Sequence, residues 1–306
     1  MKRVAVLGAT GFAGKAVCEE LEKGSYYVGR FSYSRGCDLL NIGQARRKIK
    51  DFAPEFIVNC AARVGSLRYV SEYAGDVIYE NMLMALNLYR IVQKMAETVI
   101  INPIANCAYP GELAVLEEEK FWNGEIHPSV MPYGATRRLM VSAARAYYNQ
   151  YGVRSINLVT PNMYGPGDSI DPWKTHALNA LVIKLVRAVK EGKEQIEVWG
   201  SGKPVREWLY VKDFARLVRM AIEKGDAPVE LVNLAQYRGY TVMEISEMIA
   251  EMCDYRGVIY YNTEKPDGAA SKIMHDREFR KRFAGFEFTA IDEGIRDTIE
   301  YYRGIL

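Results

Sequence analysis

The first half of the chain alternates between short apolar runs and longer stretches in which apolar residues recur at helical spacing. The apolar runs predict five strands, over Val4–Leu7, Tyr27–Tyr33, Glu55–Cys60, Thr98–Ile104 and Ser155–Val159. The longer stretches predict four helices, over Ala13–Leu21, Ile42–Phe52, Val77–Met95 and Tyr133–Tyr151. Because strands and helices alternate, we expect one parallel, doubly wound sheet with helices on both faces.

The pattern changes after Thr160. Turn-forming residues gather over Tyr164–Pro172, and they are followed by an expected helix near His176–Glu191, a short strand over Ile196–Trp199 and a turn over Gly200–Pro204. The remainder is mixed and contains no internal repeat or low-complexity stretch. The last third is therefore expected to form a smaller α/β lobe that is interleaved with the sheet domain.

Three glycines separate the first strand from the first helix. Gly8 suits a tight strand-to-helix turn, Gly11 allows a pyrophosphate to approach the backbone, and Gly14 lets the helix pack closely on the strand. The amides that open this helix then point toward the phosphates. The cofactor contacts predicted here are Gly8, Thr10, Gly11, Phe12, Ala13 and Gly14. The alternative is an accidental glycine-rich turn.

A chain of 306 residues can bury a full core and form one large or two modest domains. Together with the glycine turn, this predicts an α/β fold built on a Rossmann-type doubly wound sheet. We expect the dinucleotide-binding domain to cover residues 1–165 plus returning C-terminal segments. Residues 166–306 are expected to form most of a smaller substrate-binding lobe.

The second strand should end beside the adenosine ribose, where an NAD site usually places an acidic residue. The stretch Gly29–Arg35 has no acid, and the first one to follow is Asp38. The hydroxyls of Ser32 and Ser34 and the guanidinium of Arg35 suit a 2′-phosphate instead. NADP(H) is therefore favoured over NAD(H), with Asp38 near the adenine. The alternative is that the arginines of this stretch are solvated surface charges.

Composition narrows the function further. Hydrophobic residues make up 49% of the chain and charged residues 25%, as in an ordinary globular enzyme, and a net charge of +2 argues against general attraction to nucleic acid or membranes. No apolar run is long enough to span a membrane, and Met1–Arg3 leads into a strand rather than a secretory signal. The five cysteines are widely spaced and the three histidines are scattered. We expect a cytoplasmic protein without a disulfide framework or a metal site.

Tyr133 and Arg137 lie four residues apart and share one face of a predicted helix. A fixed cation beside a phenol stabilises phenolate and lowers the tyrosine pKa, which is otherwise near 10. With a dinucleotide fold before it, this pair resembles the extended short-chain dehydrogenase/reductase family (NAD-dependent epimerase/dehydratase), whose hallmark is Tyr-x-x-x-Lys. Within that family the chain resembles the GDP-L-fucose synthases. The stretches that carry the resemblance are Asn59–Gly65, Tyr79–Met82, Asn106–Pro110, Pro161–Pro166, Thr175–His176, Val198–Gly202, Arg206–Leu209 and Lys265–Gly268.

The resemblance implies a two-part reaction on a nucleotide-linked 4-keto-6-deoxy sugar. A base and an acid invert C3 and C5, which the ketone acidifies, and hydride from NADPH then reduces C4 while a tyrosine supplies a proton. The epimerising pair of the family falls on Cys107 and His176, and the tyrosine on Tyr133. Thiolate and imidazole both titrate near neutral pH, so each can exchange protons with a carbon acid. The alternatives are that Cys107 is a small buried hydrophobe and His176 a loop or core histidine.

Two positions depart from the family pattern. Ala105 replaces a serine or threonine whose hydroxyl binds the reacting oxygen, and Arg137 replaces the lysine, with which it is not interchangeable. The neighbouring Asn106 offers an amide donor in place of the hydroxyl. Three hypotheses remain open. They are an active epimerase/reductase with an adjusted triad, an epimerase whose reduction is slow or absent, and a nucleotide-binding pseudoenzyme that serves as a regulatory or scaffold partner.

The resemblance also implies contacts to the substrate and to the rest of the cofactor. The substrate contacts expected are Arg63, Val64, Asn162, Lys184, Trp199, Arg206 and Asp267. The further cofactor contacts expected are Ala61, Ala62, Ile104, Ala105, Tyr133, Arg137, Thr160, Asn162, Met163 and His176. Lys184 and Arg206 offer cations to a diphosphate and Trp199 a flat face to a base, unless they are solvated cations and a core tryptophan. Ser271 stands where the family usually has arginine, which leaves the base open.

The helices expected over Val77–Val92 and around Leu139–Tyr148 are apolar on more than one face, which suggests a partner. The resemblance implies that these helices pair across a two-fold axis as a four-helix bundle. The expected partners are therefore a nucleotide-diphosphate sugar and a second copy of the chain, with no nucleic acid and no membrane.

Overall fold

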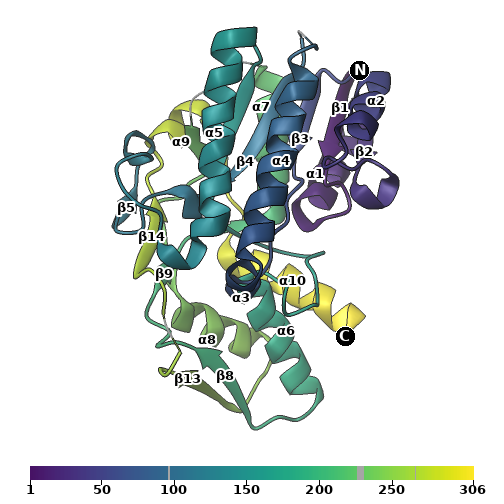
Figure 1. Ribbon diagram of the computed structural model, residues 1–306. Coiled ribbons are helices and arrows are strands. Elements are labelled where there is room, and N and C mark those ends of the chain that lie inside the picture. The colour runs from purple at the N-terminus through teal and green to yellow at the C-terminus, as the bar shows by residue number, and fades with distance from the viewer. Residues whose placement is uncertain (96, 226–230, 266) are drawn as a thin grey trace.

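The computed structural model describes residues 1–95, 97–225, 231–265 and 267–306. A six-stranded, fully parallel sheet forms its centre, with the strand order β11-β6-β4-β3-β1-β2 (Figure 1). The strands of this sheet are β1 (Lys2–Leu7), β2 (Tyr26–Phe31), β3 (Phe56–Asn59), β4 (Val99–Ala105), β6 (Ser155–Thr160) and β11 (Leu231–Asn233). The predicted doubly wound α/β class is confirmed.

Helices cover both faces of the sheet. One face carries α1 (Phe12–Glu22), α7 (Val211–Lys224) and α9 (Arg277–Arg282), and the other carries α2 (Ile42–Phe52), α4 (Ala74–Val92) and α5 (Met131–Tyr151). In β1, Val4 and Val6 pack into the core beneath α1, α7 and α9, whereas Ala5 and Leu7 pack into the core beneath α2, α4 and α5. Because such a strand is buried on both sides, its sequence is continuously apolar.

A smaller lobe begins where the chain leaves the carboxyl end of β6. Its paired strands are β7 (Asn162–Tyr164) with β10 (Trp208–Tyr210) and β8 (Gln195–Trp199) with β13 (Val258–Asn262). A further sheet has the order β12 (Tyr240–Thr241), β9 (Val205–Arg206), β14 (Ser271–Met274) and β5 (Val115–Leu116). A separate core is enclosed by α6 (Ala177–Lys190), α8 (Val242–Met252) and α10 (Ile291–Ile305) (Figure 1). The short helical turns are α3 (Leu67–Glu72), η1 (Tyr33–Arg35), η2 (Asn106–Ala108), η3 (Glu118–Lys120) and η4 (Pro128–Val130).

Most differences from the sequence prediction lie at the ends of elements. The strand predicted to reach Tyr33 stops at Phe31, because the turn η1 occupies Tyr33–Arg35 and is followed by Gly36, which has a φ of 70°. The pattern did not predict β11, which has only three residues. The division at residue 165 stays a prediction, although α7, β11 and α9 return from beyond it to pack with the main sheet.

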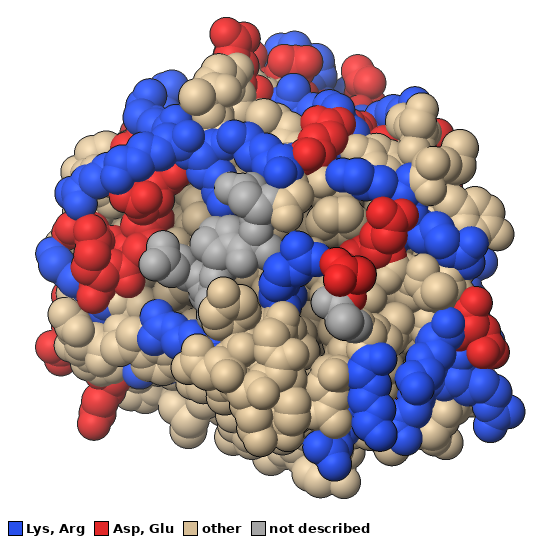
Figure 2. All heavy atoms as spheres, turned by 90° about the horizontal axis from the view of Figure 1, so that it is seen from above, with Lys and Arg blue, Asp and Glu red and all other residues tan. Residues whose placement is uncertain are grey.

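Charges of both signs share the face of the molecule seen in Figure 2, where Lys and Arg side chains lie among Asp and Glu. None of the helices in the described ranges is long and apolar enough to cross a membrane. Within the same ranges, no three His, Cys, Asp or Glu side chains are grouped so that they could hold a metal ion.

Candidate active site

The glycine turn after β1 is too tight for side chains. Gly8 has a φ of 73°, and a Cβ there would lie 2.6 Å from the carbonyl oxygen of Cys60. A Cβ on Gly14 would lie 2.2 Å from the carbonyl oxygen of Gly8. Gly11 precedes α1 and its amide donates to Gly8 O at 2.9 Å. The backbone therefore forms a close-packed cradle with the first turn of α1 at its edge, which is the geometry that binds phosphate groups.

Three hydroxyls gather beside the end of β2. The Oγ atoms of Ser32 and Ser34 are 3.0 Å apart, and Thr10 Oγ1 lies 3.4 Å from Ser34 Oγ. Arg35 is exposed next to them. Such a cluster of donors suits a phosphate ester.

The other charged residues of this stretch have structural partners. Arg30 forms a two-point ion pair with Glu22, at 2.7 and 2.8 Å, so for this residue the surface-charge alternative describes the structure. Asp38 accepts from the amide of Leu40 at 2.9 Å and thereby stabilises the turn before α2. Any contribution of Asp38 to an adenine site would be additional to this role.

Arg137 is buried against Tyr133 on the first turns of α5. Its guanidinium carbon lies 4.6 Å from the centre of the tyrosine ring, and its Nη2 donates to Asn81 Oδ1 at 3.0 Å. The expected lowering of the tyrosine pKa is wrong for the protein without ligands, because burial raises the pKa of Tyr133 and outweighs the opposing effect of Arg137. The Nε of Arg137 is buried without a partner.

Asn81 on α4 was not predicted as a site residue. Its Oδ1 also accepts from the backbone amide of Arg63 at 3.0 Å, and its Nδ2 donates to the Arg63 carbonyl at 2.8 Å. Asn81 therefore joins α4, the segment after β3 and the cation of α5. Its position inside the quoted stretch Tyr79–Met82 was the available signal.

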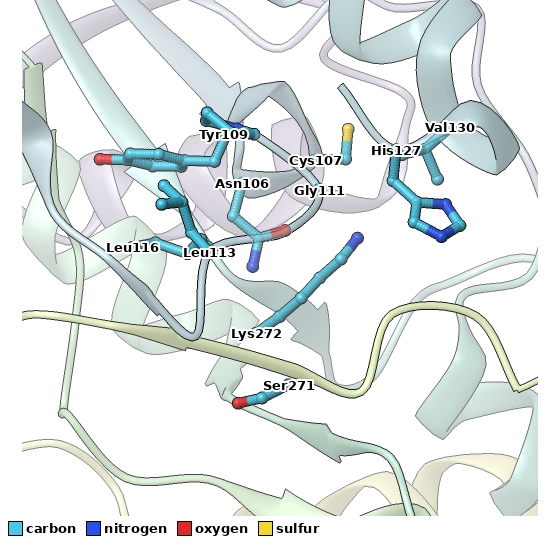
Figure 3. A pocket seen from close by; sticks show the side chains of 11 residues that line it. Asn106, Cys107, Tyr109, Gly111, Leu113, Leu116, His127, Val130, Ser271 and Lys272 are labelled. Carbon is cyan, nitrogen blue, oxygen red and sulfur yellow. The ribbon is translucent and has the colours of Figure 1, made fainter. Parts of the chain in front are cut away.

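Cys107 lies in η2, directly after β4. Gly134 of α5 packs on it so closely that a Cβ there would lie 2.7 Å from the Cys107 carbonyl oxygen. Cys107, Asn106, His127 and Lys272 line one narrow pocket (Figure 3) of about 10 Å³, which is about the space of one water molecule. Burial raises the pKa of the Cys107 thiol, and the cations of Lys272 and Arg137 oppose this rise.

Two further polar side chains line this pocket, one predicted from the sequence and one not. Asn106 is 5% exposed and its Nδ2 has no partner, so the amide donor suggested in place of the missing hydroxyl is available. His127 was not predicted, and it lines the pocket with its Nδ1 2.8 Å from Ser129 Oγ. In the sequence, His127 stands directly before Pro128, and nothing in this context distinguishes it from an ordinary loop residue.

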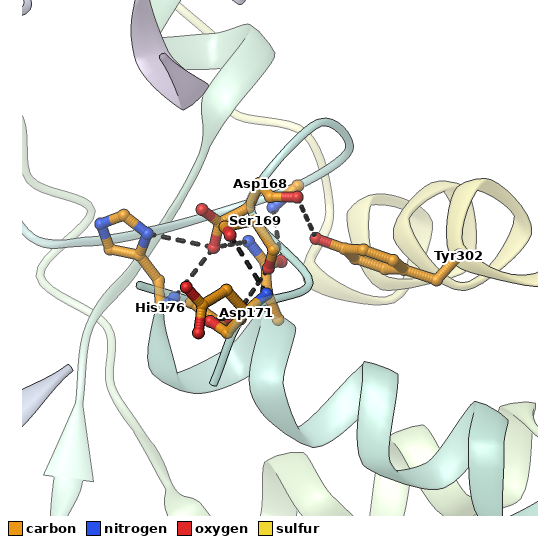
Figure 4. Close-up of polar contacts among 8 residues, drawn as sticks. Asp168, Ser169, Asp171, His176 and Tyr302 are labelled. Atoms are coloured by element: carbon orange, nitrogen blue, oxygen red, sulfur yellow. Dashed lines mark hydrogen bonds and ion pairs between the residues drawn. The ribbon is translucent and has the colours of Figure 1, made fainter. Parts of the chain in front are cut away.

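His176 precedes α6 and is held by a buried carboxylate. Its Nδ1 lies 3.1 Å from Asp168 Oδ2, and its backbone amide donates to the same oxygen at 2.9 Å (Figure 4). Although burial alone would raise it, these hydrogen bonds lower the pKa of Asp168, with help from Asn179. With Nδ1 directed to Asp168, Nε2 is the nitrogen that can exchange a proton.

The structure therefore places the two expected acid–base residues, Cys107 and His176, on different sides of the candidate site. The ring of His176 lies 5.3 Å from that of Phe12, which begins α1 beside the glycine turn. Cys107 lies on the Tyr133 side, and a negative charge on Cys107 would raise the pKa of Tyr133. No hydrogen bond or ion pair in the described part of the chain joins Cys107 to His176. A ligand that contacts both must lie between them.

Two cations stand side by side on the lobe. The parallel strands β9 and β14 pair Arg206 with Lys272, so both side chains leave the same face of this small sheet. Burial lowers the pKa of both groups, and the charge of Arg206 lowers that of Lys272 further. Lys272 was not predicted as a site residue, because its register with Arg206, 66 positions earlier, is not visible in the sequence.

The remaining substrate-side residues are disposed as follows. Trp199 is 58% exposed, and Lys265 Nζ lies 5.5 Å from its ring centre. Asp267 accepts from the amide and hydroxyl of Ser201, at 2.6 and 2.8 Å. Lys184 Nζ donates to the Glu197 carbonyl at 2.6 Å. Pro266, which belongs to the quoted stretch Lys265–Gly268, lies outside the described residues.

Near the main sheet, the predicted residues around Arg63 have mostly structural contacts. The Arg63 side chain is bonded to Tyr69 at 2.7 Å and paired with Glu80, so its cation is already neutralised. Ala61 packs against the core beneath α4 and α5, and Met163 against the core of the other face. The hydroxyl of Thr160 lies 3.5 Å from the carbonyl of Ile104, across the ends of β6 and β4. Val64, Ala62 and Asn162 are partly exposed or exposed near these strand ends.

The sheet order and the glycine turn define a dinucleotide-fold α/β protein. A model of the NAD dependent epimerase/dehydratase family matches residues 4–235, and the chain belongs to this family. It is 24% identical to a probable GDP-L-fucose synthase of Drosophila melanogaster over 312 residues, which cover 99% of this chain and 97% of the relative. It is 26% identical to GDP-L-fucose synthase of Escherichia coli over 315 residues, with 98% and 96% covered.

Solved structures show the same fold. A GDP-6-OMe-4-keto-L-xylo-heptose reductase from C. jejuni superposes with a TM-score of 0.90 at 21% identity, covering 99% of this chain and 98% of the other. A GDP-L-fucose synthetase from Naegleria fowleri bound to NADP superposes with a TM-score of 0.88 at 23% identity, covering 98% and 92%. At these identities the superpositions establish the fold alone.

Proposed function

We propose that this protein is an NADP(H)-dependent epimerase/reductase that acts on a GDP-linked 4-keto-6-deoxy sugar or a related keto sugar. One observation carries the proposal: Tyr133, Arg137 and Cys107 lie together at the carboxyl edge of the sheet, and the smaller lobe places the paired cations Arg206 and Lys272 within electrostatic reach of Cys107. The relatives named above are GDP-sugar enzymes over nearly their whole length, which supports GDP as the nucleotide.

The residues present fit NADP(H). A Cβ at Gly8 or Gly14 would collide with the backbone, so only glycine allows this tight turn before α1, and Ser32, Ser34 and Arg35 offer donors for a 2′-phosphate. Bound NADPH would supply the hydride for C4. The remaining cofactor contacts proposed are Thr10, Phe12, Ala13, Asp38, Ala61, Ala62, Ile104, Ala105, Thr160, Asn162, Met163 and His176.

For epimerisation, we assign Cys107 and His176 to opposite faces of the sugar. One removes a proton from C3 or C5 and the other returns a proton to the same carbon from the far side. Asp168 directs Nε2 of His176 toward this exchange. In the protein without ligands the thiol of Cys107 keeps its proton at neutral pH, because burial raises its pKa.

For reduction, the hydroxyl of Tyr133 would donate a proton to the C4 oxygen. The unpartnered Nδ2 of Asn106 is the second donor available to that oxygen. A second candidate function is favoured by Ala105, whose methyl group cannot bind the reacting oxygen. In that case the protein epimerises its substrate and reduces it slowly, and a separate reductase completes the sugar.

A single experiment separates these functions. The protein is mixed with NADPH and GDP-4-keto-6-deoxymannose in deuterated water, and deuterium at C3 and C5 is followed together with NADPH absorbance. Deuterium uptake with NADPH consumption supports the epimerase/reductase. Uptake without consumption supports the second candidate. Absence of both, across several nucleotide-linked keto sugars, contradicts the proposal and favours a nucleotide-binding pseudoenzyme.

A further inference from the structure

Glu207 is a buried carboxylate that the proposed chemistry does not use. It lies between β9 and β10 and has no exposed surface. Its Oε1 accepts from the backbone amide of Gln236 and its Oε2 from that of Met274, at 2.8 Å, and the amide of Tyr237 also donates to the carboxylate. In the described ranges no lysine, arginine or histidine forms an ion pair with it. Glu207 is therefore held by backbone amides alone.

These amides connect Glu207 to the strand that carries Lys272. Met274 is the last residue of β14, and the backbone amide of Glu207 donates to the carbonyl of Lys272 at 3.3 Å. In the register of β9 with β14, Lys272 lies directly beside Arg206. The side chain and the backbone of Glu207 therefore both tie β14 to the strand of Arg206.

The hydrogen bonds of Glu207 hold β9 and β14 together against the repulsion between Arg206 and Lys272. Arg206 and Lys272 repel each other, and burial removes much of the water that would screen them. Without a ligand, the repulsion favours separation of the two strands. Their spacing decides whether one diphosphate can contact both cations.

The carboxylate is costly in this place. Burial raises the pKa of Glu207 to about 7, and the negative charge of Asp276 adds to the rise. Because this pKa lies above the ordinary value, the folded state binds the proton more tightly than the unfolded state does. The contribution of Glu207 to stability therefore falls as pH rises toward 7. A glutamine would avoid the cost of a buried charge and still offer an amide oxygen to the backbone donors, so the negative charge is explained better by a role at the site than by stability.

We propose that Glu207 is a positioning residue, whose ionised form fixes Arg206 and Lys272 at the spacing that receives the diphosphate of the nucleotide sugar. This inference rests on the proposed function. It predicts that substrate binding weakens when Glu207 gains a proton, since a protonated carboxyl has lost one acceptor for the amides it holds. The other ionisable or charged groups on the elements around it are Arg206, Lys272, Asp276, His275 and Arg238.

The test uses GDP-mannose, which has no group that ionises between pH 6 and pH 8. Its dissociation constant is measured by calorimetry at both values for the wild type, for Glu207→Gln and for the control Glu118→Gln. Glu118 is a partly buried glutamate nearby that accepts from the amide of Asn233 at 2.9 Å and holds β11 instead of β14. Since the ionised fraction of a group with a pKa of about 7 changes by at most about tenfold between these values, we expect wild type and control to bind several-fold, and at most about tenfold, more weakly at pH 6 than at pH 8. Glu207→Gln should bind weakly at both.

Two outcomes of this titration would overturn the proposal. They are wild-type affinity in Glu207→Gln, and a uniform loss of affinity that keeps the wild-type dependence on pH, because the latter describes a merely structural residue. If the wild type does not bind GDP-mannose, the proposed function is contradicted.

Hydrogen exchange tests the role of Glu207 independently of substrate binding. Unchanged protection of the Gln236 and Met274 amides in Glu207→Gln would overturn that role even if the proposed function is correct.

Discussion

The guanidinium of Arg137 is fixed between the ring of Tyr133, 4.6 Å from its carbon, and the side-chain oxygen of Asn81. A lysine in this place would present one ammonium, whereas the planar guanidinium contacts both groups and keeps Nε free of protein partners. The cation beside the phenol is thus held by a residue from another helix. This dependence can be tested directly.

Replacing Asn81 by alanine should weaken both stability and reduction. The change leaves the buried Nη2 of Arg137 and the amide of Arg63 without an acceptor, which costs about 1–3 kcal/mol for each group left unpaired. Urea unfolding measures the loss, and NADPH consumption measures reduction. Asn87→Ala is the matched control on the same helix, since Asn87 donates to the carbonyl of Leu39 at 2.7 Å, away from Arg137 and Arg63. Equal reduction rates in the two variants would contradict the role of Asn81.

Replacing Ala105 by serine should accelerate reduction. The added hydroxyl would supply the donor to the C4 oxygen that the chain lacks, and one such donor is worth about a hundredfold in rate. We expect NADPH consumption to rise by at least tenfold while deuterium uptake at C3 and C5 stays unchanged. Ala105→Gly adds no donor and serves as the control. A similar acceleration in both variants would show that backbone freedom, and not the hydroxyl, limits the rate.

The sequence was sufficient where a function depends on neighbouring residues. Gly8 and Gly14 could be assigned because the strand, the turn and the helix that they join are adjacent in the chain. Tyr133 and Arg137 could be placed on one helical face for the same reason. The main sheet followed from the order of apolar runs, since strands buried on both faces have continuous apolar sequences.

Contacts between distant segments were not predictable. Arg30 offered a cation to a phosphate, but Glu22 from the preceding helix occupies it. Lys272 became visible as a partner of Arg206 only through the register of β9 and β14. The predicted shift of the Tyr133 pKa had the wrong direction, because burial, which depends on the whole fold, raises this pKa by more than the cation of Arg137 lowers it.

Replacing Cys107 by serine should suppress proton exchange more than reduction. A serine hydroxyl is a far weaker acid than a thiol, so deuterium uptake at C3 and C5 should fall by about 10²-fold or more. Reduction of a substrate that is already epimerised should fall much less. Cys253→Ser, at a buried cysteine in the core of the lobe, is the control. Equal losses of exchange and reduction with substrate affinity retained would remove the role given to Cys107.

Lys272 should control the ionisation of Cys107. Burial raises the pKa of this thiol and the Lys272 ammonium opposes the rise, so Lys272→Met should raise the pKa further. Less thiolate is then present at pH 8.5, and alkylation of Cys107 by iodoacetamide should slow. Mass spectrometry of the Cys107 peptide measures the rate, with Lys265→Met as the control. Faster or unchanged alkylation in Lys272→Met would show that its charge does not reach the thiol.

The outer faces of α4 and α5 should join two copies of the chain. Tyr79 and Leu86 of α4 are 66% and 40% exposed, and Tyr148 of α5 is 46% exposed, although all three are large and hydrophobic. The two helices lie side by side (Figure 1), and we expect a second copy packed on them to cover these exposed side chains. A dimer in sedimentation at micromolar concentration is the expected result for the wild type.

A charge placed in this surface should separate the copies. Leu86→Glu buries a carboxylate in an apolar interface, which costs several kcal/mol unless the interface opens. We expect monomers, with the fold retained because Leu86 already faces solvent within one chain. Tyr260→Glu, on β13 of the lobe and 47% exposed, adds the same charge elsewhere and should remain dimeric. A wild type that sediments as a single monomeric species at micromolar concentration would rule out this interface.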